Sequence, residues 1–162
     1  MAGFAAAVLT THGTYWKLSP AFARLQAWLD GASLSRADAP IAIFYDDPAV
    51  KPPELCRYSV CFPLSAAAAE ELRAASSPSP GREATTPPDD SYEVWDFPIT
   101  PAAVVEYYGP AADSSAVYAR LEAWIDDQGL CAEGPPRERY LALPGSLGKG
   151  IMHVEVQQPL ER

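Results

Sequence analysis

The sequence is poor in the residues from which metal sites and disulfide frameworks are built. Its 162 residues include only two histidines and three cysteines, at positions 56, 61 and 131. An odd number of cysteines gives no complete disulfide framework, so a reducing compartment, the cytoplasm, is the expectation. Cys56 and Cys61 are five residues apart and would lie on opposite faces of a strand, so we expect no metal site. The glycine-rich stretch 145–150 lacks the spacing of a phosphate-binding loop, and we expect no cofactor.

Basic residues are also scarce. The chain has 12 lysines and arginines against 21 aspartates and glutamates, a formal charge of −9. Such a balance argues against nucleic acid and anionic membranes as partners, and mildly favours a cationic or neutral small-molecule ligand. The apolar run at the N-terminus is too short to span a bilayer, so no membrane segment is expected. A protein partner is left unknown.

The chain does contain a repeated segment. The stretch "FARLQAWLD" at 22–30 returns as "YARLEAWID" at 118–126, an offset of 96 residues. The same offset aligns 6–64 with 102–160 without a gap, and 17 of the 59 aligned positions are identical. Hydrophobic residues make up 48% of the chain, enough for a sizeable core. The sequence therefore predicts two copies of one unit.

Each copy has the pattern of a β-α-β-β unit. Alternating or β-branched runs predict strands, and apolar residues at helical spacing predict one helix per copy. The expected strands are 5–11, 41–45 and 55–62, then 102–108, 137–142 and 151–157; the expected helices are 19–30 and 114–128. Trp28 and Trp124 occupy matched positions and are expected to anchor the two helices in the core.

The two copies are joined by a segment of different composition. Residues 65–76 predict an alanine-rich helix, 77–91 a mobile loop rich in proline and serine, and 92–98 a strand. We thus expect one domain, 1–162, with repeat 1 at 5–64, the connection at 65–91 and repeat 2 at 92–160. The predicted fold is α+β with pseudo-two-fold symmetry, its helices on the outer face and its antiparallel sheets forming a cleft. Such a cleft is the default ligand site.

Several stretches resemble the GyrI-like family, also called the bacterial effector-binding domain family. They are "HGTYWKLSPAFARLQAWLD", "IFYDDPAVKPPELCRYSV", "EYYGPAADSSAVYARLEAWIDDQGL" and "ERYLALPG". Within the family, the second stretch and "WIDDQGLCAEGPPRERYL" look most like the GyrI-like domain of the testis-expressed reticulophagy receptor. The resemblance implies binding of small cationic or aromatic molecules between the repeats, and in some members hydrolysis of cyclopropane-containing toxins.

Glu138 is the main candidate site residue. The family resemblance implies that a glutamate two residues before a tyrosine reaches into the cleft, and "ERY" matches that motif. Period-two geometry puts Glu138 and Tyr140 on one face of the strand, and Arg137 and Arg139 on the other. The carboxylate would serve as a counter-charge for a cation or as a general base. The alternative is an exposed glutamate paired with a neighbouring arginine.

Aromatic residues near the strand ends could frame a flat ligand. Tyr140, Tyr107 and Trp95 are the ranked candidates. Three hypotheses for function follow: a small-molecule-binding protein, a hydrolase that uses Glu138 as a base, and a protein-interaction scaffold related to the reticulophagy receptor. Because one scaffold can host many functions, only the site itself distinguishes among them.

Overall fold

The computed structural model describes residues 3–75 and 91–161. The strands are β1 (Phe4–His12), β2 (Ile41–Phe44), β3 (Arg57–Leu64), β4 (Ser91–Phe97), β5 (Ala102–Pro110), β6 (Arg137–Tyr140) and β7 (Ile151–Pro159). The α-helices are α1 (Ser19–Gly31), α2 (Ala66–Ala75) and α3 (Ser114–Asp127), and single 3₁₀ turns span Pro53–Leu55 and Ala111–Asp113. Each predicted strand and helix is present. The loop expected at 77–91 lies, except for Ser91, outside the described residues.

The strands form one antiparallel sheet, which confirms the predicted α+β class. Its order is β4-β1-β3-β2-β6-β7-β5, so β1-β3-β2 on one side of the centre mirrors β5-β7-β6 on the other. In the central pair Ala42 lies opposite Glu138, and these two positions are also 96 residues apart. A two-fold axis relating the halves would pass through this pair. The order and register agree with the predicted duplication.

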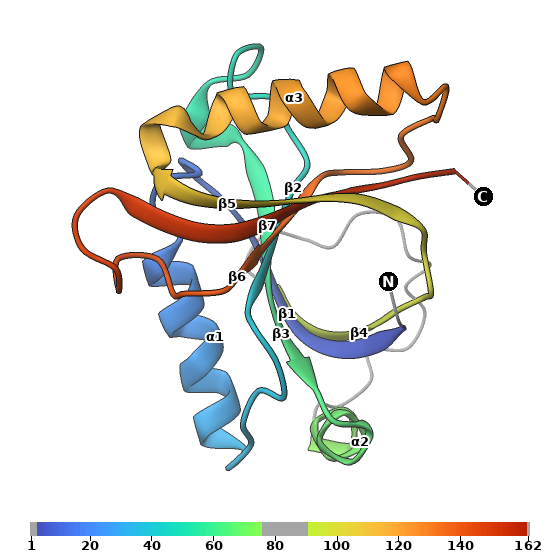
Figure 1. The fold of residues 1–162 in the computed structure, drawn as a ribbon. Helices are drawn as coiled ribbons and strands as arrows, with labels where there is room; N and C mark the ends of the chain where they lie inside the picture. The colour runs from blue at the N-terminus through green and yellow to red at the C-terminus, as the bar shows by residue number, and fades with distance from the viewer. Residues whose placement is uncertain (1–2, 76–90, 162) are drawn as a thin grey trace.

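All three α-helices cover the same face of the sheet. The main hydrophobic cluster joins Leu25 of α1, Leu72 of α2 and Leu121 of α3 to sheet residues such as Leu9, Val60 and Val156. Figure 1 shows α3 running above β5 while α1 runs beside β1 and β3. The buried residues of α1 are Ala21, Phe22, Leu25 and Leu29, and those of α3 are Val117, Leu121 and Ile125. Burying each large apolar side chain contributes roughly 1.5–3 kcal/mol.

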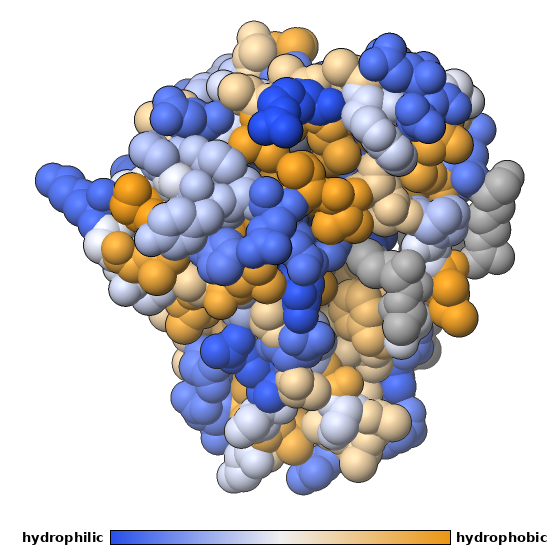
Figure 2. Space-filling model, viewed as in Figure 1, coloured by the Kyte–Doolittle hydropathy of each residue, from blue (hydrophilic) through white to orange (hydrophobic). Residues whose placement is uncertain are grey.

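The opposite face of the sheet has no helix among the described residues. Its buried apolar residues form a smaller cluster of Ala6, Val8, Ile41, Ile43, Cys61 and Phe97. The helices therefore lie on one side, as predicted, and the sheet's other side is available for grooves. Figure 2 shows exposed hydrophobic residues lying between hydrophilic ones. No helix in the described part of the chain is long and apolar enough to cross a membrane.

The two repeat tryptophans differ, which corrects the expectation that both anchor a helix. Trp28 is half-buried, and its ring lies 5.4 Å from that of Tyr92 on β4. Trp124 is 49% exposed. The reason is topological: β4 flanks β1 beside the first copy, whereas no described strand flanks β5 beside the second. Trp124 therefore has no counterpart of Tyr92 to pack against.

We predict that stability follows this asymmetry. Leu25→Ala and Leu121→Ala, at matched buried positions, should each destabilise by about 2–5 kcal/mol. Trp124→Ala should destabilise by clearly less than Leu121→Ala, about 1 kcal/mol, because about half of the Trp124 side chain is exposed. Urea unfolding followed by circular dichroism measures all three. A loss at Trp124 as large as that at Leu121 would contradict the packing described here.

Candidate functional site

Strand β6 separates its side chains by face, as the alternation predicts. Glu138 is 7% exposed and Tyr140 is 4% exposed, whereas Arg137 and Arg139 lie on the other face and are half-buried. The face that holds Glu138 differs from the expectation. Glu138 is the lateral partner of Ala42 and Val156, which belong to the main cluster under the helices. The carboxylate thus lies on the helix-covered face, between α1 and α3, and not on the bare face of the sheet.

Two tyrosine hydroxyls hold the Glu138 carboxylate. Tyr118 of α3 donates a hydrogen bond to Oε1 at 2.7 Å, and Tyr140 donates one to Oε2 at 2.5 Å. Within the described residues no cationic side chain forms an ion pair with Glu138. The predicted alternative, pairing with a neighbouring arginine, is therefore wrong, because the strand's pleat turns those arginines away. The carboxylate is hydrogen-bonded but has no counter-charge.

Aromatic rings from both halves surround this carboxylate. Phe22 of α1 packs edge-to-face against Tyr140 at 5.6 Å between centroids. Tyr15, which precedes α1, packs on Phe44 at 4.6 Å and lies close enough to Tyr118 to influence its ionisation. Phe22 and Tyr118 are matched repeat positions, as are Phe44 and Tyr140. These four rings of the site therefore come from matched positions of the two predicted copies.

Burial determines the protonation behaviour of this group. Removal from water raises the pKa of Glu138, and the hydrogen bonds from Tyr140 and Tyr118 only partly offset that rise. The pKa of Tyr118 and that of Tyr140 are both raised, first by burial and then by the adjacent Glu138 carboxylate. Both hydroxyls therefore stay protonated and act as donors at neutral pH. The neutral carboxyl form is favoured more than in an ordinary glutamate.

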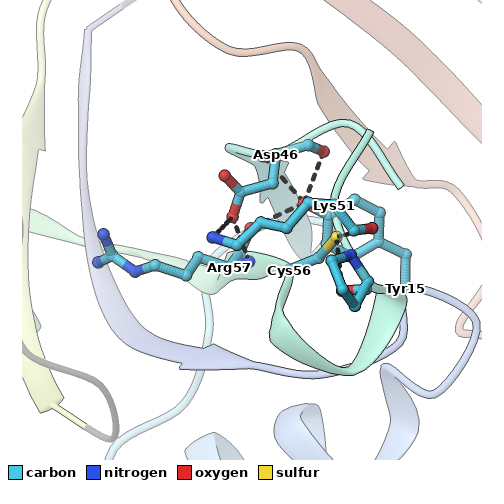
Figure 3. A network of polar contacts seen from close by, with 6 residues as sticks. Tyr15, Asp46, Lys51, Cys56 and Arg57 are labelled. Atoms are coloured by element: carbon cyan, nitrogen blue, oxygen red, sulfur yellow. Dashed lines mark hydrogen bonds and ion pairs between the residues drawn. The ribbon is translucent and has the colours of Figure 1, made fainter. Parts of the chain in front are cut away.

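A polar network fixes the loops beside this site. The Tyr15 hydroxyl lies 2.8 Å from the carbonyl oxygen of Asp46 and 2.9 Å from that of Arg57, and it accepts a hydrogen bond from the Asp46 amide at 3.0 Å. The Asp46 carboxylate receives the Arg57 amide at 2.7 Å and the Lys51 ammonium at 3.1 Å (Figure 3). These bonds hold the pKa of Asp46 below its usual value, the Arg57 amide contributing most. The network positions the Tyr15 ring against Phe44.

The other two ranked aromatics do not join Glu138. Tyr107 lies on the same face, but two strands away from Tyr140, and its hydroxyl donates to the Pro110 carbonyl at 2.7 Å. Trp95 lies on the opposite face, as the lateral partner of Ala6, and its indole N–H donates to Glu93 at 2.8 Å. Trp95, ranked among the aromatics that could frame a ligand, therefore does not share a face with Glu138. The register of β4, which decides this, was not readable from its own sequence.

Sequence reasoning missed Tyr118 and Phe22 as site residues. Both were treated only as members of a helical stripe. The signal was present, since they are the first residues of the two repeated stretches and lie near the start of α1 and of α3. Among the described residues, no cluster of histidine, cysteine, aspartate and glutamate side chains could hold a metal ion.

Comparison with protein families identifies the fold. The model of the GyrI-like small molecule binding domain matches residues 1–161. The chain belongs to this family. No curated protein matches the sequence.

Solved structures of low sequence identity share this fold. An uncharacterised conserved protein from Listeria innocua has a TM-score of 0.69 at 13% identity, over 99% of this chain and 89% of that one. A hydrolase from Listeria innocua has a TM-score of 0.65 at 10% identity, over 99% and 88%. SAV2435, solved bound to tetraphenylphosphonium, has a TM-score of 0.55 at 10% identity, over 99% and 90%. At such identities the likeness concerns the fold alone.

We predict that the raised pKa of Glu138 makes stability depend on pH. Folding stability from this group is fully present below the glutamate pKa of the unfolded chain, about 4.3, and is lost as pH rises through the higher folded value. Glu138→Gln does not titrate, so the variant should gain stability over the wild type as pH rises from about 4 to about 8. Thermal unfolding at several pH values measures this difference.

The matched control is Glu122→Gln, which changes an exposed glutamate on α3. It removes a glutamate charge at the protein surface and so provides the comparison for the buried one. If the gap between Glu138→Gln and the wild type is constant across the same pH range, burial does not displace the ionisation of Glu138.

Proposed function

We propose that this protein binds a small cationic aromatic molecule, with Glu138 as the counter-charge. The observation that carries the proposal is a buried carboxylate whose hydrogen-bond partners in the described chain are two tyrosine hydroxyls, with no cation paired to it. An uncompensated buried charge costs the folded state several kcal/mol. A bound cation would remove that cost, so the site has a built-in affinity for positive charge.

The surrounding rings support an aromatic ligand. Phe22, Tyr118 and Tyr140 present ring surfaces from α1, α3 and β6 around one carboxylate. A cation over such a ring gains about 0.5–2 kcal/mol. The family's small-molecule-binding character and the tetraphenylphosphonium bound to SAV2435 agree with this chemistry.

Tyr118 covers the Glu138 carboxylate in the proposed site. Its side chain is partly exposed, whereas Glu138 and Tyr140 are buried, so Tyr118 lies between the carboxylate and solvent. A ligand that reaches Glu138 displaces the Tyr118 hydroxyl from Oε1. The charge–charge contact with the ligand then replaces that hydrogen bond.

Tetraphenylphosphonium and the neutral triphenylphosphine oxide test the proposal. Glu138→Gln preserves shape but removes the charge, so the Kd of the cation should rise at least about tenfold while that of the neutral probe changes by less than about twofold. Tyr118→Phe removes the displaced hydrogen bond and should leave cation binding equal or tighter. Isothermal titration calorimetry measures both probes.

Glu122→Gln serves again as the matched control and should affect neither probe. The counter-charge role is wrong if Glu138→Gln weakens both probes equally. It is also wrong if the cation binds the wild type and Glu138→Gln with equal affinity.

Hydrolysis is the second candidate function, favoured by the fold shared with a Listeria innocua hydrolase. A glutamate with a raised pKa is suited to general-base catalysis. Glu138 would take a proton from water while the oxygen attacks an electrophilic cyclopropane carbon. The breaking ring bond leaves its electron pair on the neighbouring carbon, stabilised by the activating substituent, and that carbon takes up the proton from Glu138, so that one water is added in total. No second carboxylate among the described residues lies near enough to Glu138 to affect its ionisation, so the site has only one candidate catalytic acid or base. For this reason we rank catalysis behind binding.

Incubation with an activated cyclopropane separates the two functions. A hydrolase should yield the product carrying one added water, detected by mass spectrometry, and Glu138→Gln should abolish turnover while retaining substrate binding. Binding without turnover favours the binding protein. Unchanged probe affinities together with no turnover favour the third hypothesis, an interaction scaffold related to the reticulophagy receptor.

A further inference from the structure

The bare face of the sheet holds a groove directly behind the Glu138 site. It has a volume of about 630 Å³ and is lined by Pro98, Thr100, Glu133, Arg137, Pro159 and Glu161. Arg137 comes from β6, the same strand as Glu138, but points to the other side of the sheet. A groove of this size is within the range that holds small ligands.

Arg137 is a guanidinium group without a partner in the described chain. Its charge lies over the Phe97 ring at 5.2 Å, yet no described side chain or carbonyl hydrogen-bonds or ion-pairs with it. Arg139, two residues further along the same face, contrasts with it, since it binds Asp38 at 2.8 Å and Glu155 at 3.2 Å. A guanidinium has five N–H donors in a planar fork. The Nε–H of Arg137 is buried, so the donors that a ligand in the groove can reach are those of the two terminal nitrogens.

A second polar atom without a partner lies beside Arg137, at a residue that does not itself line the groove. Arg137 Nε and Gln157 Oε1 are buried without a partner, and the two residues are lateral neighbours on β6 and β7. A buried polar atom left unpaired costs about 1–3 kcal/mol.

Two carboxylates complete the chemistry of the groove. Glu133 and Glu161 line it together with Arg137 and are exposed. Neither comes within ion-pairing distance of Arg137 or of any other described cation. The groove therefore offers separate positive and negative groups.

We propose that this groove is a second binding site, which takes a small zwitterion carrying a carboxylate and an ammonium group, as a short peptide does. The planar fork of Arg137 matches a carboxylate in two-point contact. Glu133 and Glu161 receive the ammonium. A simple anion would be disfavoured by these two carboxylates and by the chain's charge of −9. Pro98, Pro159 and the Phe97 ring beneath Arg137 supply apolar contacts.

Trialanine, its N-acetyl derivative and its C-terminal amide are the probes for this site. Trialanine should bind with a Kd on the order of 1 mM, typical of a ligand of its size. Loss of either terminal charge should raise that Kd at least about fivefold, since each charge has its own partner in the groove. In ¹H–¹⁵N correlation spectra, trialanine should shift the Arg137 Nε–H signal.

Arg137→Gln should raise the Kd of trialanine at least about tenfold. The Kd of Arg137→Lys should lie between those of the wild type and Arg137→Gln. Arg139→Gln is the matched control, because that arginine is already paired, and it should change the Kd by less than about twofold. Thermal unfolding establishes that each variant is folded.

The proposal is overturned if trialanine shows no saturable binding up to about 10 mM, or binds no better than its capped forms. It is likewise overturned if folded Arg137→Gln and Arg137→Lys both bind like the wild type. Glu138→Gln should leave trialanine binding unchanged, and Arg137→Gln should leave tetraphenylphosphonium binding unchanged. The test of this proposal is therefore independent of the test of the Glu138 site.

Discussion

The carboxyl group of Glu138 is enclosed by the hydrophobic core, and the structure around it is constrained by that burial. A carboxylate removed from water needs hydrogen-bond donors for its oxygens, or it forfeits several kcal/mol of stability. Tyr118 supplies one donor from α3 and Tyr140 supplies the other from β6. The position of α3 over the sheet is thereby coupled to the polar group at the sheet's centre. A molecule that replaces the Tyr118 hydrogen bond to the carboxylate would therefore also affect the position of α3.

The pleat of one four-residue strand gives the molecule two chemically different faces. Glu138 and Arg137 are adjacent in sequence, and in a flexible chain they would neutralise each other. In β6 their side chains point to opposite sides of the sheet, so the negative charge is buried under the helices and the positive charge lines the groove. Neither charge can satisfy the other. Neither has an ion-pair partner among the described residues.

Much of the fold followed from the sequence because the signals were local or repeated. The fixed offset of 96 located β2 and β6 together, and alternation along "RERY" correctly separated Glu138 from its arginine neighbours. Alternation alone does not say which face the helices cover. The first-copy counterpart "IAIF" is buried on both faces and carries no polarity to decide it.

The remaining errors arose from contacts between distant segments. Trp28 and Trp124 have near-identical local sequences, and only the position of β4 distinguishes their surroundings. The same strand misled the reading of Trp95, because its face is fixed by pairing with Ala6 of β1. Strand β4 ends before residue 102, where the aligned part of the second copy begins, so the repeat carried no information about its register.

The predicted duplication explains why a single carboxylate occupies the centre of the sheet. Ala42 and Glu138 are matched positions that face each other across the central strand pair. Side chains so placed lie about 4.5–5.5 Å apart at Cβ, and two buried carboxylates there would repel each other.

Two identical copies would therefore place either no carboxylate or two carboxylates at the sheet centre. A single carboxylate requires that the predicted copies differ at this position. Phe22 against Tyr118 and Phe44 against Tyr140 differ in the same sense, each by the hydroxyl present in the second copy. Those two hydroxyls are the donors that Glu138 requires. The three differences form one unit, because the glutamate without its tyrosines would be buried and unsatisfied, while the tyrosines without the glutamate would have hydroxyls in an apolar core.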